Sequence, residues 1–205
     1  DNQFAAARAG IADWSRASPK SRVGVLLEVT ERLYRERLFE IVQAVMHTTG
    51  QSFGMAYAGS GVNALDRGIE ALVYAYQAMN SIVPLARWER NFGSTPIRLE
   101  KRYRLIPRGV AVCFSCASFP TWNAWPSMMA SLATGNAVLV KPHPATVAPM
   151  AMSPAQSIAV VKRVPGGTEG LPQTISTIRF ESVQVTGSRL FPGRKGRRLP
   201  IRRRL

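Results

Sequence analysis

An apolar strand, a helix and a second apolar strand follow one another between residues 110 and 141. Residues 110–115 read Val-Ala-Val-Cys-Phe-Ser, a run that suits a strand buried on both faces of a parallel sheet. Residues 121–134 have a helical pattern, Gly135-Asn136 is a helix-ending pair, and residues 137–141 form the next strand. This succession within about 30 residues is typical of a right-handed βαβ unit. It predicts an α/β fold.

Helices are expected ahead of this unit. A short one is expected at residues 5–14. Ser18-Pro19 is a helix start signal for a long amphipathic helix that runs to about Met46 and stops at Gly50. A further helix is expected from Val62 to Ile82. The apolar residues expected on the buried sides of the two long helices are Val23, Leu26, Leu27, Leu33, Leu38, Ile41, Val42, Val45, Ala64, Leu65, Ile69, Leu72, Val73 and Tyr76.

A β-like segment lies between the helices and the βαβ unit. Residues 97–106 have the composition of a strand, and Pro107-Arg-Gly109 is a turn signal before the apolar strand at Val110. This pattern predicts a β-hairpin around residues 96–109. The whole prediction is an incomplete Rossmann-like parallel sheet with leading helices and this hairpin.

Positive charge is concentrated at the end of the chain. The net charge is +15, and residues 151–205 hold 11 Lys/Arg against Glu169 and Glu181. A block of like charge is usually disordered, so residues 151–205 are expected to be a disordered basic tail. Residues 189–205 could form a phosphate-binding arm for nucleic acid. Alternatively, the tail is not a selected sequence, since it has no helical or strand period and its last 14 residues hold no aromatic side chain to stack a base.

Cys113 and Cys116 are the two cysteines of the chain. A zinc site would need further ligands at comparable spacing, and no second pair follows, so no metal site is expected. Both cysteines are expected to be buried or to line a pocket. The low cysteine content favours a reducing compartment, and no apolar run is long enough for a membrane span. We therefore expect a cytoplasmic protein.

Lys141 ends the second apolar strand and is followed by Pro142. Ligands of open α/β sheets bind at the carboxyl ends of the strands. A lysine at this position can direct its ammonium group towards ribose or phosphate oxygens, although an isolated lysine at a strand end is often only solvated.

Three motifs now point to one family. Ser118-Phe-Pro120, Leu132-Ala-Thr-Gly-Asn136 and Lys141-Pro142 occur in the order and spacing of the P-W-N-F-P loop, the A-L-A-x-G-N helix end and the K-P strand end of the aldehyde dehydrogenase superfamily. The resemblance covers about residues 10–150. The Lys141–Thr146 sequence, Lys-Pro-His-Pro-Ala-Thr, resembles the branch linked to phenylacetic acid degradation.

The resemblance implies roles for several residues. Lys141 matches the lysine that contacts the adenosine ribose of the cofactor, and Phe114, Ser115, Cys116 and Ala117 match the strand end and loop that line the cofactor cleft. Ser118 matches the asparagine that helps to form the oxyanion hole, although a hydroxyl has a shorter reach than an amide. Pro144 stands where many NAD-specific members carry a glutamate that binds the ribose hydroxyls. NADP is therefore at least as plausible a cofactor as NAD.

The family's cysteine nucleophile and glutamate base lie well after the K-P strand, and nothing after Thr146 supplies them. The segment Thr186-Gly187-Ser188 resembles a family loop that touches cofactor phosphate, and Gly187 and Ser188 are candidates for that role. Chance is the other explanation in a segment so rich in small residues.

These observations divide the chain into residues 1–150, the N-terminal part of a cofactor-binding domain, and the tail. The first hypothesis is a truncated aldehyde dehydrogenase that is inactive alone, its ligands being an aldehyde and a nicotinamide cofactor, and that assembles as a homo-oligomer through the hairpin at 96–109. The alternatives are a basic protein that binds nucleic acid through residues 189–205, and a non-catalytic partner of a complete homologue. No association with membranes is expected.

Overall fold

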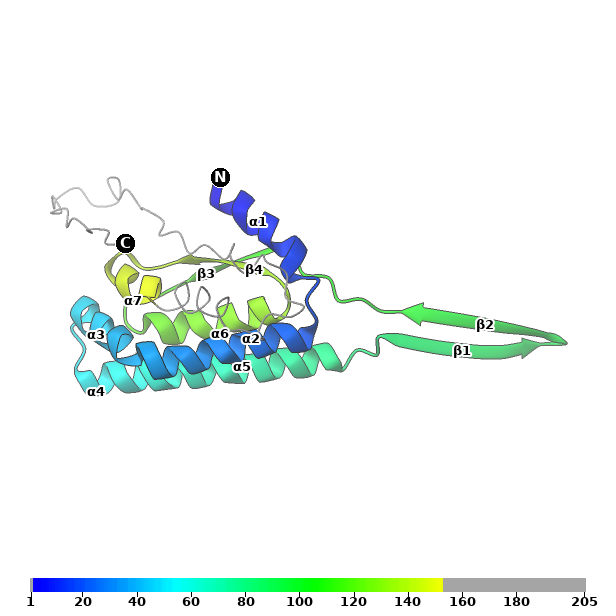
Figure 1. Ribbon diagram of the computed structural model, residues 1–205, viewed down its shortest axis with the longest axis horizontal. Helices are drawn as coiled ribbons and strands as arrows, with labels where there is room; N and C mark the ends of the chain where they lie inside the picture. The colour runs from blue at the N-terminus through cyan, green and yellow to red at the C-terminus, as the bar shows by residue number, and fades with distance from the viewer. Residues whose placement is uncertain (1, 153–205) are drawn as a thin grey trace.

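The computed structural model describes residues 2–152, which form a layer of helices, two parallel strands above it and a hairpin that projects to one side (Figure 1). This arrangement confirms the predicted α/β class. The elements in chain order are α1 (Asn2–Trp14), α2 (Pro19–Arg32), the π-helical turn η1 (Leu33–Arg37), α3 (Leu38–Thr49), α4 (Phe53–Met55), the π-helical turn η2 (Ala56–Val62), α5 (Asn63–Asn80), β1 (Leu85–Phe92), β2 (Thr95–Arg102), β3 (Val110–Phe114), α6 (Pro120–Ala133), β4 (Ala137–Lys141), the 3-10 turn η3 (Pro144–Thr146) and α7 (Val147–Met152).

The first long helix begins and ends where the sequence predicts. The Ser18 hydroxyl oxygen accepts a hydrogen bond from the backbone N–H of Ser21 at 3.0 Å, and Pro19 is the first helical residue. α2, η1 and α3 then follow without a break. Gly50 ends the run with a φ of 74°, and its N–H donates to the carbonyl of Met46 at 2.9 Å. Only glycine adopts this left-handed conformation readily, which makes it an effective helix end.

The main core lies between the long helix, α5 and α6. Its largest fully buried side chains include Trp125, Leu33, Ile41, Leu72 and Met128. Burial of this many large apolar groups is the main favourable contribution to folding, at roughly 1.5–3 kcal/mol for each side chain.

The buried stripe of α5 differs from the predicted one. It runs through Gly68, Leu72 and Ala75, and a Cβ at Gly68 would already lie 3.6 Å from the Met129 side chain of α6. These small residues let α6 approach closely, and this contact turns other apolar positions outward. Ile69 and Val73 of α5, which were predicted to be buried, are 38% and 47% exposed, and Leu27 of α2, also predicted to be buried, is 43% exposed.

β3 and β4 form the predicted parallel pair, and α6 connects them. Val110 pairs with Ala137 at the start of the ladder. Gly135 follows α6 with a φ of 89°, and the side-chain oxygen of Asn136 accepts the N–H of Gly109 at 3.0 Å. The Gly-Asn pair therefore both ends the helix and attaches the next strand to the beginning of β3.

The prediction that β3 is buried on both faces is wrong. Cys113 is buried, but Val112 and Phe114 are 43% and 65% exposed. Successive side chains of a strand point to opposite faces. α6 packs against β3, and the face that carries Val112 and Phe114 is left open by the described residues.

The hairpin does not lie at residues 96–109. β2 pairs in antiparallel fashion with β1, from Leu85 opposite Arg102 to Phe92 opposite Thr95, and Gly93 makes the turn with a φ of 63°. The sequence reasoning missed β1 and placed the turn at Pro107-Arg-Gly109. That segment instead leads into β3, which pairs with β4 and packs against α6.

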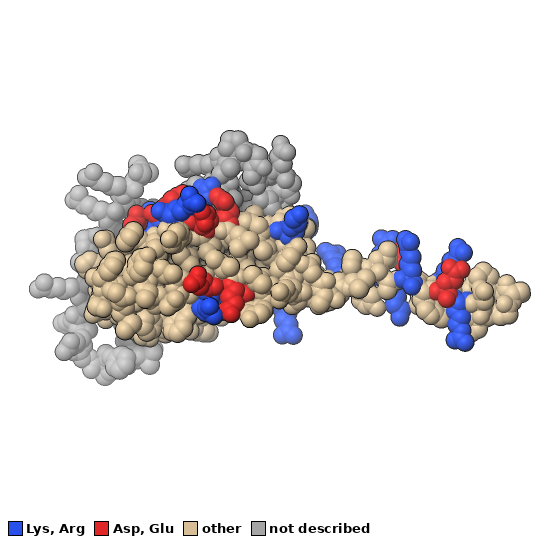
Figure 2. Space-filling model, turned by 90° about the horizontal axis from the view of Figure 1, so that it is seen from below, with Lys and Arg blue, Asp and Glu red and all other residues tan. Residues whose placement is uncertain are grey.

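The two faces of the hairpin differ in chemistry. One carries ion pairs between Arg87 and Glu100 at 3.3 Å and between Arg98 and Glu89 at 3.1 Å. The opposite face carries the apolar side chains of Trp88, Phe92, Ile97 and Leu99, which follow from the strand register. Figure 2 shows the charged side chains along this narrow projection. Its apolar face remains exposed in the described chain.

Candidate functional site

The carboxyl ends of β3 and β4 meet at one edge of the parallel pair. Phe114, the last residue of β3, is paired with Lys141, the last residue of β4. The backbone N–H of Ser115 donates to the carbonyl of Lys141 at 3.0 Å. The Lys141 ammonium nitrogen lies 5.8 Å from the centre of the Phe114 ring, and both residues are exposed. The fold thus brings together the residues predicted to line a cofactor cleft.

Hydrogen bonds hold the loop that follows β3. The buried Ser115 donates its hydroxyl proton to the carbonyl of Pro120 at 3.0 Å. The N–H of Cys116 donates to the side-chain oxygen of Asn123 at 3.2 Å, and the Cys116 carbonyl accepts from the Thr146 hydroxyl at 3.3 Å. The Ser115 side chain therefore shapes the loop from within. The sequence reasoning missed Asn123 and Thr146, which connect the loop to α6 and to the segment after β4.

Ala117 and Ser118 are the exposed residues of this loop. The side-chain amide of Gln51 donates to the backbone carbonyl of Ser118. The Ser118 hydroxyl oxygen lies 3.7 Å from the sulfur of Cys116. An exposed hydroxyl in this position has a proton that it can donate to a developing negative charge on a ligand.

Two aromatic side chains follow Ser118 within four residues of the chain. Phe119 and Trp122 make an edge-to-face contact, with ring centroids 5.7 Å apart and planes at 88°. Trp122 is 46% exposed. The motif Ser118-Phe-Pro120 includes Phe119, but no role was predicted for either aromatic residue. The adjacent run Phe-Pro-Thr-Trp after Ser118 was the signal that could have identified them.

The two cysteines have different environments. Cys113 is buried, and burial raises the pKa of its thiol, an effect that the hydrogen bond from the Ser127 hydroxyl at 3.4 Å partly opposes. Cys116 is partly exposed in the loop, and its sulfur accepts the N–H of Phe119 at 3.4 Å. Both thiols are free. A buried thiol with a raised pKa is a poor nucleophile, because the thiolate is the reactive form.

Buried polar groups fix the end of α6 that leads into β4. Arg22 is 5% exposed, and its Nε donates to the carbonyl of Ala133 at 2.8 Å. Burial lowers the pKa of the Arg22 guanidinium. The indole N–H of Trp14 donates to the carbonyl of Leu132 at 2.7 Å. These side chains satisfy carbonyls that a helix end leaves without intrahelical partners. The sequence reasoning missed Arg22.

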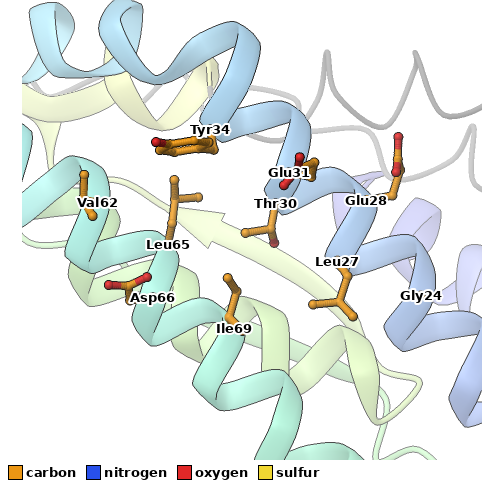
Figure 3. A pocket seen from close by; sticks show the side chains of 10 residues that line it. All are labelled: Gly24, Leu27, Glu28, Thr30, Glu31, Tyr34, Val62, Leu65, Asp66 and Ile69. Carbon is orange, nitrogen blue, oxygen red and sulfur yellow. The ribbon is translucent and has the colours of Figure 1, made fainter.

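A groove of about 510 Å³ lies between the long helix and α5 (Figure 3). Leu27 and Tyr34 line one side, Leu65 and Ile69 the other, and Asp66 lies among them. The groove contains none of the residues predicted to bind a cofactor or to act in catalysis. It is therefore separate from the site at the ends of β3 and β4.

Several predictions concern residues outside the described range. Gly187 and Ser188, the predicted phosphate-binding residues, lie there, as does the basic segment 189–205 that the alternative of nucleic-acid binding requires. Within residues 2–152, no cluster of three potential metal ligands is present. No helix in that range has the length and apolar character needed to cross a membrane.

The sequence was compared with models of known protein families. The model described as the aldehyde dehydrogenase family matches residues 1–191, which is most of the 205-residue chain. The chain belongs to the aldehyde dehydrogenase family. The match includes residues 151–191, so the domain boundary at residue 150 stays a prediction.

Solved structures of aldehyde dehydrogenases are similar to this chain. An NAD-dependent aldehyde dehydrogenase from Burkholderia multivorans is 42% identical, with a TM-score of 0.74 over 78% of this chain and 29% of that one. Proline utilization A from Bradyrhizobium japonicum is 21% identical, with a TM-score of 0.52 over 81% of this chain and 16% of that one, and shares the fold. No curated protein matches. The chain spans less than a third of the length of these aldehyde dehydrogenase-like structures.

Proposed function

We propose that this chain is the N-terminal, cofactor-side part of an aldehyde dehydrogenase that, when complete, oxidises an aldehyde to an acid with NADP or NAD. The pairing of Phe114 with Lys141 carries the proposal, because it places an exposed ammonium group beside the loop at residues 115–118. A cation at the carboxyl end of parallel strands suits ribose or phosphate oxygens. The nicotinamide of the bound cofactor would supply the acceptor for hydride from the substrate.

The residues after Lys141 favour NADP at least as much as NAD. Pro144 stands where the family resemblance places a glutamate that binds ribose hydroxyls, and proline offers no carboxylate. His143 precedes it, and its Nδ1 accepts the N–H of Ala145 at 3.2 Å. A 2′-phosphate would therefore meet the Lys141 ammonium without repulsion from an acid at position 144. Phe114, Cys116 and Ala117 would line the adjacent cleft.

Ser118 would orient the aldehyde. Its hydroxyl is exposed in the loop after β3 and could donate one hydrogen bond to the oxygen of a bound aldehyde. Neither Cys113, which is buried, nor Cys116, which lies in the loop itself, occupies the place of the family's nucleophile. We therefore expect the 205-residue chain to bind cofactor without oxidising aldehydes.

The hairpin would join copies of the chain. Trp88 and Leu99 are opposite each other on its apolar face, with exposed fractions of 47% and 45%. An isolated two-stranded hairpin is marginally stable in water, and burying this face against a second copy would stabilise it. The same apolar face could also bind a complete homologous subunit.

The substrate branch and the cellular location are further parts of the proposal. The sequence from Lys141 to Thr146 resembles the branch associated with phenylacetic acid degradation, so we propose that the complete protein oxidises an aldehyde of that pathway. The low cysteine content is consistent with a cytoplasmic protein.

Titration of the purified chain with NADP⁺ and NAD⁺ by calorimetry tests the cofactor assignment. Lys141→Ala should weaken NADP⁺ binding by about tenfold, the scale of one charge-assisted contact of roughly 1.4 kcal/mol. Lys101→Ala is the matched control, because Lys101 is an exposed lysine of the hairpin. Equal affinities for the wild type and the Lys141→Ala variant would contradict the assignment. NADPH production from an aldehyde by the pure chain would contradict the expected inactivity.

A further inference from the structure

Residues 51–60 contact the loop that carries Ser118, and the first turn of α6 that follows it, at three places. The side-chain amide of Gln51 donates to the carbonyl of Ser118. The hydroxyl of the buried Thr121 donates to the carbonyl of Ser60. Between these two hydrogen bonds, the ring of Phe119 lies against Gly59. The geometry of the loop therefore depends on a segment about 60 residues earlier in the chain, much of which is the π-helical turn η2.

The contact with Phe119 requires that residue 59 has no side chain. A Cβ at Gly59 would lie 2.4 Å from Cε1 and 2.6 Å from Cδ1 of the Phe119 ring, well inside van der Waals contact. The backbone does not demand glycine there, because φ of Gly59 is not positive. The close approach of the ring is therefore the specific feature that a side chain at this position would abolish. π-Helical turns of this kind occur frequently at functional sites.

We propose that Gly59 is a positioning residue that sets the width of the aldehyde entrance beside Ser118. The proposal rests on the function proposed above. Phe119 follows Ser118 directly, and its ring makes an edge-to-face contact with the exposed Trp122. By letting the ring lie against its backbone, Gly59 fixes the position of the aromatic side chain that directly follows Ser118. A methyl group at position 59 would push the ring away from η2 and disturb its contact with Trp122.

The first experiment measures the position of the ring in the 205-residue chain. In the wild type, nuclear Overhauser effects should connect the Phe119 ring protons with the α-protons of Gly59. In Gly59→Ala, the chemical shift of the Trp122 indole proton should move, because the edge-to-face contact changes. Gly54→Ala is the matched control, since Gly54 is exposed and a Cβ there meets no atom within 4 Å. An unchanged Trp122 signal in Gly59→Ala would overturn the proposal.

The second experiment measures the consequence for ligands, with quenching of tryptophan fluorescence as the readout. Gly59→Ala should weaken the binding of benzaldehyde by about tenfold and that of propanal much less, because one added methyl group in a close-fitting site discriminates on this scale. NADP⁺ affinity should not change. In a Phe119→Ala background, the Gly59→Ala substitution should lose its effect, because the group it displaces is gone.

The outcomes separate this proposal from the one on which it rests. Equal weakening of benzaldehyde and propanal, or the same loss in Gly54→Ala, would overturn the role of Gly59 in selectivity. If the wild-type chain bound neither aldehydes nor NADP⁺, the proposed function would fail, and the role of Gly59 at an aldehyde entrance would fail with it. If the wild type bound NADP⁺ but Gly59→Ala did not change the preference between benzaldehyde and propanal, only the proposed role of Gly59 would be contradicted.

Discussion

The guanidinium of Arg22 donates to the carbonyl of Ala133 at 2.8 Å, although 111 residues separate them in the chain. Arg22 also donates to the carbonyl of Ala17, just before the start of α2. One buried cation thus joins the beginning of the long helix to the end of α6. No ion pair to Arg22 occurs among residues 2–152, so backbone carbonyls, which carry partial negative charge, take the place of a carboxylate.

Replacing Arg22 by methionine should lower the free energy of unfolding by about 3 kcal/mol. The substitution leaves the buried carbonyls of Ala133 and Ala17 without donors, and each such group costs roughly 1–3 kcal/mol. Urea denaturation followed by circular dichroism measures the change. Arg35→Met is the control, because the Arg35 side chain is 72% exposed and its ion pair with Glu31 contributes about 0.5 kcal/mol or less. Equal losses in both variants would show that Arg22 does not act through its buried contacts.

The stability of the fold should decrease at alkaline pH through Cys113. Burial raises the pKa of its thiol above the ordinary value of 9.0, so the unfolded chain loses this proton at a lower pH than the folded chain. The contribution of the protonated Cys113 thiol to the free energy of unfolding is fully present below about pH 8. It is lost as the pH rises through 9.0 towards the pKa of the folded state. Urea midpoints between about pH 7 and pH 10 should fall less steeply in Cys113→Ala than in Cys116→Ala. Parallel pH profiles would refute this linkage.

The apolar face of the hairpin should control self-association. Trp88→Ser removes the largest side chain of that face and should weaken the association of copies by at least about tenfold, as loss of an interface tryptophan commonly does. Glu89→Gln changes the neighbouring residue on the charged face and should have little effect. Sedimentation velocity over a range of concentrations distinguishes the two variants. A wild-type chain that remains monomeric at all concentrations would contradict the proposed role of the hairpin.

The meeting of Phe114 and Lys141 at one edge of the parallel pair could be predicted from sequence, because it depends on strand ends. Once β3 and β4 are recognised as parallel neighbours, Phe114 and Lys141 must lie at the same edge. The geometry of the loop that carries Ser118 could not be predicted in this way. It depends on Gly59 and Gln51, which approach the loop from a distant segment, and no local pattern marks a glycine whose missing side chain accommodates a ring.

The position of the hairpin also could not be predicted from the sequence. The sequence from Leu85 to Phe92 has Trp88 and Phe92 among polar residues without strict alternation, and only Gly93 after it marks a turn. Pro107-Arg-Gly109 is also a local turn signal. Which of the two turns closes the hairpin depends on which strand pairs with β2. In the structure β3 pairs with β4 and packs against α6, and β2 pairs with β1.

By itself, the sequence determined the long helices, the helix ends at Gly50 and Gly135, and the α/β class of the fold. Caps, turns and apolar periodicity act within a few residues, so they can be recognised without knowledge of the rest of the chain. Only the tertiary structure decided which strands pair, which face of α5 is buried, and how Arg22 and Gly59 act. The contacts of Arg22 and Gly59 join segments 60 residues or more apart, and all of these features depend on packing that no local pattern records.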